Sequence, residues 1–350
     1  MHAWWMQMTH TDTVLEQRDS PVPTPGARQL LVRMHAASLN RGEFLLGHGL
    51  HGKAGSWKAI GGEGAGEVVS VGAEVTAFKP GDRVMARCPG SFAEFALMEA
   101  AETMHVPANL SWEQAASIPM TFLVSFDMLV LQGRLKAGEW LLINGVSSGV
   151  GVASLQLGKA LGAKVMGTSG SEAKLATLKP LGLDLALCTR KPDFAAAVMD
   201  ATAQRGADLV INTVGGTVFA ENIRAMAFEG RLATVGYVDG VVKAEIDLEA
   251  LHAKRLTLFG VSNKLRSKEQ RAAALPRFVA EVLPFFASGA ITPQIDQVMD
   301  LAQLPKAKAC MESAGHVGKI VLRMAPSSSG ITAPSPSEIF APSPSGRGLG

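Results

Sequence analysis

The chain has 350 residues, a length that favours about two domains. Hydrophobic residues make up 47% and charged residues 18%, which is typical of a compact soluble protein and argues against a largely disordered one. The 33 basic and 31 acidic residues leave a formal charge of +2, so the sequence does not suggest a nucleic-acid partner.

The spacing of the cysteines and the length of the apolar runs favour a reducing compartment and no membrane span. Cys88, Cys188 and Cys310 lie far apart and form no CxxC pair, so neither a disulfide framework nor a cysteine zinc site is predicted. The first ten residues lack a basic region followed by an apolar core, and no apolar run reaches the roughly 20 residues needed to span a bilayer. We expect a cytoplasmic protein without membrane contact.

The first third of the chain is predicted to be rich in strands. Apolar runs at 29–38, 64–75 and 78–86 are separated by glycine and proline. From Ser111 the pattern changes, because 111–132 begins with a serine followed by acidic and amide residues and then shows helical spacing of apolar positions. This stretch predicts a helical linker into a second domain.

Strands and helices alternate after residue 139, which is the pattern of a parallel sheet with crossover helices. The expected strands are 140–144, 163–169, 185–188, 207–214, 231–236 and 256–262. After Asn263 a basic, alanine-rich helix leads to strand-like runs at 291–300 and 316–324, which we expect to complete the first domain. The Pro/Ser/Gly-rich tail 325–350 has no residues for a core and is expected to be disordered.

The stretch NGVSSGVG at 144–151 follows an expected strand and opens an expected helix. In that context a glycine-rich bend predicts a dinucleotide site, because small residues let a pyrophosphate approach the free amides of the helix N-terminus. Ser147, Ser148, Gly149 and Val150 are the candidates for this contact. A plain strand-to-helix turn is the alternative interpretation.

The residues after the second strand bear on cofactor choice. An acidic residue about 20 residues past the motif would favour NAD(H), but Thr168, Ser169 and Gly170 stand there, and Lys174 follows on the next helix. The pattern favours NADP(H), although Glu172 nearby points the other way. The alternative is a solvated loop beside an ordinary surface lysine.

Several motifs together resemble one family: AASLNRGEFL, GGEGAGEVVSVGAEVTAFKPGDRV, SFAEFALM, ASIPMTFLVSFDML, NGVSSGVG, GSEAKL, NTVGG and HVGKIVL. Over about Gln29 to Met324 the chain is similar to the zinc-independent, quinone oxidoreductase-like members of the medium-chain dehydrogenase/reductase superfamily. The resemblance implies an α/β fold, in which a Rossmann doubly wound parallel sheet at 119–263 is inserted into a GroES-like β-rich catalytic domain at 1–118 and 264–324. It also implies an active site in the cleft between them and a homodimer.

Departures from the superfamily's patterns are informative. Gly145 and Ser148 occupy the first two marked positions of its AxxGxxG loop, and only Gly151 is unchanged. Where zinc alcohol dehydrogenases carry a cysteine and a histidine, this chain has Asn40 and Gly62, and the four-cysteine lobe is missing. No metal is expected.

With no metal, charge on a reduced substrate needs hydrogen-bond donors. By position in the family motifs, Asn40 and Thr121 are expected beside the nicotinamide, with a loop-structuring role as the alternative for Asn40. Arg41 and Glu43 are candidates to polarise a substrate or, as is commoner, form a surface pair.

Tyr237, the only tyrosine, follows an expected strand and could stack or donate a proton; a buried tyrosine with a satisfied hydroxyl is the alternative. Lys319 either approaches the cofactor phosphate or caps the core strand. The resemblance implies cofactor contacts at Asn40, Thr121, Ser147, Ser148, Gly149, Val150, Gly170, Lys174, Thr189, Asn212, Val235, Gly236, Tyr237 and Lys319.

Taken together, the sequence predicts an NADPH-dependent, zinc-free reductase that acts on quinones or on activated C=C bonds of enones, with a standalone enoyl reductase left open. These substrates demand the same flat apolar slot over the nicotinamide. The alternative is an NADPH-binding sensor or structural protein with little turnover.

Overall fold

The computed structural model describes residues 1–9, 13–44 and 55–325. The predicted disordered tail therefore lies, apart from Ala325, outside the described residues.

The N-terminal third and the C-terminal end build one antiparallel-rich unit around β3, Gln29–Ser38. Strand β3 is buried along most of its length, as expected of an apolar run covered on both faces. Its sheet has the order β15-β16-β3-β5-β6-β8, with β7 also pairing with β3. The other members are β5 (Glu63–Val71), β6 (Arg83–Arg87), β7 (Phe95–Glu99), β8 (Thr103–His105), β15 (Ile295–Asp300) and β16 (Lys319–Arg323). A smaller sheet, β2-β1-β4, is made of β1 (His2–Met8), β2 (Thr13–Asp19) and β4 (Trp57–Ala59).

The middle of the chain forms a six-stranded sheet in the order β11-β10-β9-β12-β13-β14. All of its neighbouring strands are parallel. The strands are β9 (Trp140–Asn144), β10 (Lys164–Ser169), β11 (Leu185–Cys188), β12 (Ala207–Asn212), β13 (Met226–Thr234) and β14 (Thr257–Gly260). The order reverses between β9 and β12, which is the switch point where doubly wound sheets bind ligands. The predicted α/β fold class, with a Rossmann sheet and a GroES-like unit, is confirmed.

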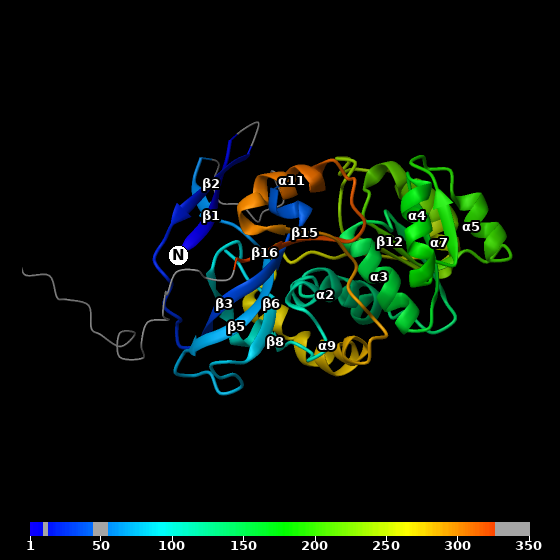
Figure 1. The fold of residues 1–350 in the computed structure, drawn as a ribbon. Coiled ribbons are helices and arrows are strands. Elements are labelled where there is room, and N and C mark those ends of the chain that lie inside the picture. The colour runs from blue at the N-terminus through cyan, green and yellow to red at the C-terminus, as the bar shows by residue number, and fades with distance from the viewer. Residues whose placement is uncertain (10–12, 45–54, 326–350) are drawn as a thin grey trace, which may run out of the picture.

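Helices join and cover these sheets. The α-helices are α1 (Trp112–Ala116), α2 (Thr121–Phe126), α3 (Gly149–Ala160), α4 (Glu172–Leu178), α5 (Ala195–Ala201), α6 (Phe219–Ala225), α7 (Leu248–Ala253), α8 (Lys268–Ala272), α9 (Leu275–Glu281), α10 (Leu283–Ala287) and α11 (Leu304–Glu312). Ser111 caps α1 in a capping box with Gln114, as its serine start suggested. Helices α2 and α3 pack together, and Figure 1 shows them in the middle of the molecule, between β12 and the strands around β3.

The helix expected after Asn263 is divided into three short helices, α8, α9 and α10. Pro276 and Pro284 each stand in the first turn of a new helix, where a missing amide proton costs nothing. Beyond them, β16 pairs antiparallel with β3 and parallel with β15. The end of the chain thus joins the sheet built by its first third, while the domain boundaries at 118/119 and 263/264 stay predictions.

Within the described ranges, no helix has the length and apolar character needed to cross a bilayer.

Candidate active site at the junction of the two sheets

The glycine-rich stretch forms a tight bend between β9 and α3. Gly145 has a φ of +71°, and a Cβ there would lie 2.6 Å from Thr213 Oγ1 on the loop after β12. The Gly145 amide donates to Thr168 Oγ1 at 3.2 Å. Thr213 Oγ1 in turn donates to the Asn144 carbonyl at 2.8 Å. The ends of three parallel strands are therefore tied together around this bend.

The first turn of α3 has backbone N–H groups that make no hydrogen bond within the helix and can bind a ligand. Ser148 is the N-cap, and its Oγ accepts a bond from the Gly151 amide at 3.1 Å. Gly149 and Val150 follow in the first turn, where amides have no carbonyl partner within the helix. Their amides, together with the small Ser147, make a cradle that fits the pyrophosphate of a dinucleotide.

The first residues of three elements meet at Gly149. A Cβ at Gly149 would lie 3.1 Å from Lys319 Cδ on β16 and 3.4 Å from Thr121 Cγ2 on α2. The Gly318 amide also donates to the Ser147 carbonyl at 3.1 Å. The predicted nucleotide loop is thus in direct contact with the C-terminal strand of the other sheet.

Glu63 is the centre of a buried polar cluster next to this contact, and its side chain is 0% exposed. Its Oε1 accepts from Ser38 Oγ at 2.6 Å, Asn40 Nδ2 at 2.9 Å and Lys319 Nζ at 2.8 Å. Its Oε2 accepts from the Met120 amide at 2.7 Å. A carboxylate with four donors is well satisfied, so this cluster is a fully hydrogen-bonded buried network beside the start of α3.

Lys319 uses its ammonium inside this cluster. It donates to Glu63 Oε1, to Asn40 Oδ1 at 2.8 Å and to the Leu39 carbonyl at 2.8 Å, which engages all three of its donors. The expectation that Lys319 approaches the cofactor phosphate is therefore not supported by this geometry. Its methylene stem, however, lies beside Gly149.

Asn40 has its amide group fully engaged. Nδ2 donates to Glu63 and to Glu43 Oε1 at 3.1 Å, and Oδ1 accepts from Lys319. These contacts agree with the loop-structuring interpretation; contact with a nicotinamide or substrate stays a prediction. Thr121, 3% exposed, donates its hydroxyl to the Ser117 carbonyl at 2.9 Å and presents its methyl group toward Gly149.

Glu43 is buried and does not form the surface pair that was considered for it with Arg41. It lies in a short 3-10 helix, Arg41–Phe44, and is 6% exposed. Arg41 instead donates to the Met311 carbonyl at 2.7 Å. Burial raises the pKa of Glu43 to about 8, opposed by the Asn40 hydrogen bond and the charge of Lys319.

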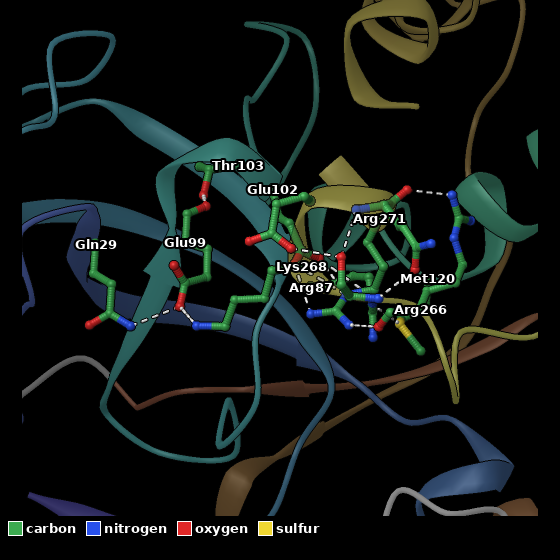
Figure 2. A network of polar contacts seen from close by, with 12 residues as sticks. Gln29, Arg87, Glu99, Glu102, Thr103, Met120, Arg266, Lys268 and Arg271 are labelled. Atoms are coloured by element: carbon green, nitrogen blue, oxygen red, sulfur yellow. Dashed lines mark hydrogen bonds and ion pairs between the residues drawn. The ribbon is translucent and has the colours of Figure 1, made fainter. Parts of the chain in front are cut away.

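A second charged network lies beside Met120 (Figure 2). Glu102 accepts from Arg271 Nε at 3.2 Å and pairs with Arg87 at 3.5 Å, while Arg87 Nε contacts Met120 Sδ at 3.3 Å. The network fastens α8 to β6 and to the residue whose amide binds Glu63. It therefore holds in place the Met120 amide that binds Glu63. Of its members, only Met120 lies in one of the motifs that the sequence indicated.

The expected adenosine end contains two cations, Lys174 and Arg190, and the charge of Arg41 also reaches Lys174. Lys174, on α4, donates to the carbonyls of Ala314 and His316, the latter at 3.0 Å. Burial lowers the pKa of Lys174; the charge of Asp296 acts against this, and those of Arg190 and Arg41 act with it. Arg190 lies over Gly170, where a Cβ would be 2.2 Å from Arg190 Nε. Arg190 was missed, although its place directly after β11 and Thr189 could have indicated it.

The remaining expected cofactor contacts lie at strand ends. Thr189 Oγ1 donates to Asp193 Oδ1 at 2.6 Å. Asn212 is 1% exposed, accepts from the amides of Val214 and Gly215, and donates to the Gly215 carbonyl, so its side chain shapes the turn after β12. The Val235 amide binds the Asn212 carbonyl, and Gly236 packs against Thr213. The role of these residues in cofactor binding stays a prediction.

Tyr237 follows β13 and is 46% exposed. The alternative of a buried tyrosine with a satisfied hydroxyl is therefore wrong. An exposed ring at the carboxyl end of the parallel sheet is accessible to a ligand, and its role stays a prediction.

Two family models match the chain. The alcohol dehydrogenase GroES-like domain matches residues 26–108, and a domain described as zinc-binding dehydrogenase matches residues 149–279. These matches fall on the sheet around β3 and on the parallel sheet. The chain belongs to the medium-chain dehydrogenase/reductase family, among its zinc-independent members. The members of this family are oxidoreductases, and the specific reaction of this chain is a separate question.

Relatives of this dehydrogenase/reductase include both small and very large proteins. The chain is 28% identical over 310 residues to a rat quinone oxidoreductase, covering 87% of this chain and 92% of that protein. It is 32% identical over 306 residues to one chain of the Mycobacterium tuberculosis phenolphthiocerol/phthiocerol polyketide synthase, covering 87% of this protein but 14% of the synthase chain. The chain spans no more than about a seventh of the polyketide synthases that it matches.

A solved mycobacterial protein in complex with NADPH has the same fold. It superposes with a TM-score of 0.83 at 29% identity, covering 92% of this chain and 100% of that protein.

Asn40 and Gly62 are the residues that the resemblance aligns with a cysteine and a histidine of zinc alcohol dehydrogenases. A Cβ at Gly62 would lie 2.4 Å from Glu43 Oε1. The match described as zinc-binding dehydrogenase begins at residue 149, so it includes neither position. Within 1–9, 13–44 and 55–325, no group of three or more His, Cys, Asp or Glu residues is placed to hold a metal ion.

Proposed function

We propose that this chain is an NADPH-dependent, zinc-free reductase that transfers hydride to a quinone or to an activated C=C bond. The proposal rests on the contact at Gly149, where the capped N-terminus of α3 meets the cluster of Glu63, Asn40 and Lys319. A dinucleotide held on the α3 amides would place its reactive end near this cluster. The rat quinone oxidoreductase and the NADPH complex support the same assignment.

In this proposal each group has one task. The amides of Gly149 and Val150 hold the pyrophosphate, and Lys174 and Arg190 hold the adenosine 2′-phosphate. NADPH, when bound, supplies the hydride. Asn40 and Thr121 orient the nicotinamide and the acceptor, and the buried cluster excludes water beneath them. Tyr237, exposed after β13, would contact the cofactor or the acceptor from the solvent side.

Hydride transfer can be tested with NADPH that carries deuterium at the transferred position. Incubation with NADPH carrying deuterium at the transferred position should place one deuterium in the reduced acceptor, detected by mass spectrometry. Parallel incubations with a quinone, an enone and an acyl thioester with a conjugated C=C bond separate the substrate classes. Bound NADPH without label transfer to any acceptor would favour the alternative, a cofactor-binding sensor or structural protein.

Replacing Lys174 by alanine should weaken NADPH binding while sparing NADH. The lost charge-assisted contact is worth about 1.5–3 kcal/mol, or about 10- to 150-fold in Kd. Arg190→Ala should act in the same direction, because its guanidinium lies over Gly170. Fluorescence titration with both cofactors measures the effect, and Lys179→Ala, at an exposed lysine in the same segment, is the matched control. Equal weakening of both cofactors would show that the 2′-phosphate is not held here.

We also expect a homodimer. Strand β14 is at the end of the parallel sheet and pairs only with β13 among the described residues, which leaves its outer edge available to a second copy. The mass in solution, from sedimentation equilibrium, decides between one and two chains.

A further inference from the structure

Glu43 is a buried carboxyl group whose second oxygen has no partner. Its Oε1 accepts from Asn40 Nδ2 at 3.1 Å, whereas Oε2 is shielded from solvent and has no hydrogen-bond partner among the residues that the structure describes. An ionised carboxylate in such a place would leave several acceptor positions unfilled, at considerable cost. A protonated carboxyl needs fewer donors, because Oε2 then carries the hydrogen.

Gly62 makes the room that this carboxyl group occupies. A Cβ at residue 62 would lie 2.4 Å from Oε1, so the carboxyl end of Glu43 would have to move to admit one. The Glu43 carboxyl thus occupies the space beside Gly62 that a side chain there would enter, one hydrogen bond away from Asn40.

Burial of Glu43 favours a proton on its carboxyl group, while the charges around it act in both directions. Glu63 on β5 is paired with Lys319 on β16, so these two charges cancel. Lys58 on β4 is the other charged group whose field reaches Glu43, and burial lowers its pKa. An ionised Glu43 would add a second carboxylate beside Glu63 in a site shielded from water, opposed by the charges of Lys319 and Lys58. Burial is the main cause of the raised pKa of Glu43, about 8; the hydrogen bond from Asn40 and the charge of Lys319 oppose it, and the charge of Glu63 adds to it.

We propose that Glu43 is the acid of the site, which holds a proton at neutral pH and gives it to the oxygen of the reduced acceptor. This inference rests on the proposed reductase function. Hydride supplied by the nicotinamide cofactor leaves an electron pair on the acceptor oxygen. The O–H bond at Glu43 Oε2 then breaks, its electron pair stays on the carboxylate, and the proton forms an O–H bond with the acceptor. One proton taken up from water then restores the Glu43 carboxyl, which requires a movement that opens Oε2, shielded in the ligand-free structure, to water.

The protonation of Glu43 can be tested without cofactor or substrate. Infrared spectra of the ligand-free chain at pH 6 to 9 should contain a protonated carboxyl band that fades with a midpoint near pH 8 and is absent in Glu43→Gln. The proton is held more tightly in the folded chain, so the stability it contributes is lost as pH rises from the ordinary glutamate value of about 4.5 to about 8. Urea denaturation should show this decline in the wild type and a flatter profile in Glu43→Gln.

The catalytic part is tested by the pH profile of turnover. Wild-type kcat/KM, which reports groups of the free enzyme, should fall above about pH 8. Glu43→Gln should lose tenfold or more at pH 7 and show no such fall, because a general acid typically contributes about 10²–10⁴-fold. Glu43→Asp, which keeps the acid but is one methylene shorter, should recover part of the rate. Glu74→Gln, an exposed glutamate paired with Arg28, is the matched control and should match the wild type.

The outcomes separate this inference from the proposed function. A wild type that reduces acceptors, with Glu43→Gln retaining its rate and pH profile, overturns the role of Glu43 and leaves the reductase intact. A missing carboxyl band, or one that persists in Glu43→Gln, overturns the protonation. A wild type with the band but with no turnover of any acceptor overturns the reductase function and, with it, the proton transfer.

Discussion

Replacing Glu63 by alanine should lower the free energy of unfolding by about 3–5 kcal/mol, because it leaves the buried Lys319 ammonium without its carboxylate. The Lys319 and Glu63 side chains are 6% and 0% exposed, so water cannot replace the lost partner. Ser38, Asn40 and the Met120 amide each lose an acceptor as well. Urea denaturation at neutral pH measures the change.

Two further variants show whether the buried charge is the cause. Glu63→Ala combined with Lys319→Met removes both charges and should be more stable than Glu63→Ala alone, since replacement of a whole buried pair by apolar groups is often nearly neutral. Glu67→Ala, on the same strand but partly exposed, should have a much smaller effect. A loss after Glu63→Ala no greater than that after Glu67→Ala would refute the account of the cluster.

Gly151→Ala should weaken NADPH binding about tenfold or more. A Cβ at residue 151 would lie 2.5 Å from the Gly145 carbonyl oxygen and 2.7 Å from that of Val146. Both are backbone atoms of the bend, so the start of α3 must move to relieve the contact. One lost hydrogen bond to a charged pyrophosphate, about 1.5–3 kcal/mol, already accounts for that factor.

Gly260→Ala is the matched control for this experiment, because a Cβ there would meet nothing within 4 Å. Fluorescence titration gives both dissociation constants, and circular dichroism establishes that each variant is folded. Wild-type affinity in a folded Gly151→Ala would mean that the bend is a plain strand-to-helix turn and does not hold the cofactor.

Much of the fold could be predicted because its signals are local. The six strands of the parallel sheet are short apolar runs separated by helical stretches, and each lies within or overlaps its expected range. The return of the chain to the first sheet was also predicted, from strand-like stretches that include β15 and β16. Strands β1 and β2 were not predicted: β2 mixes charged and apolar residues, whereas β1 contains a short apolar run, residues 3–6, that could have indicated it.

The buried cluster of Glu63, Asn40 and Lys319 could not be predicted from local sequence patterns. Glu63 stands in a glycine-rich strand motif, and nothing nearby indicates that its carboxylate is fully buried. Its partner Lys319 is 256 residues further along the chain and reaches it only because β16 and β5 flank β3 in one sheet. Glu43 was considered as half of a surface pair, because its burial depends on the space at Gly62, a contact between residues on separate elements.

The measurement that tests the account most directly is the oxidation of NADPH by the purified chain, followed spectroscopically against quinones, enones and saturated aldehydes, with NADH in parallel. We expect oxidation that depends on a quinone or an enone, is faster with NADPH than with NADH, and is absent with saturated aldehydes. NADPH binding without acceptor-dependent oxidation of either cofactor would contradict the assignment of this chain as a reductase.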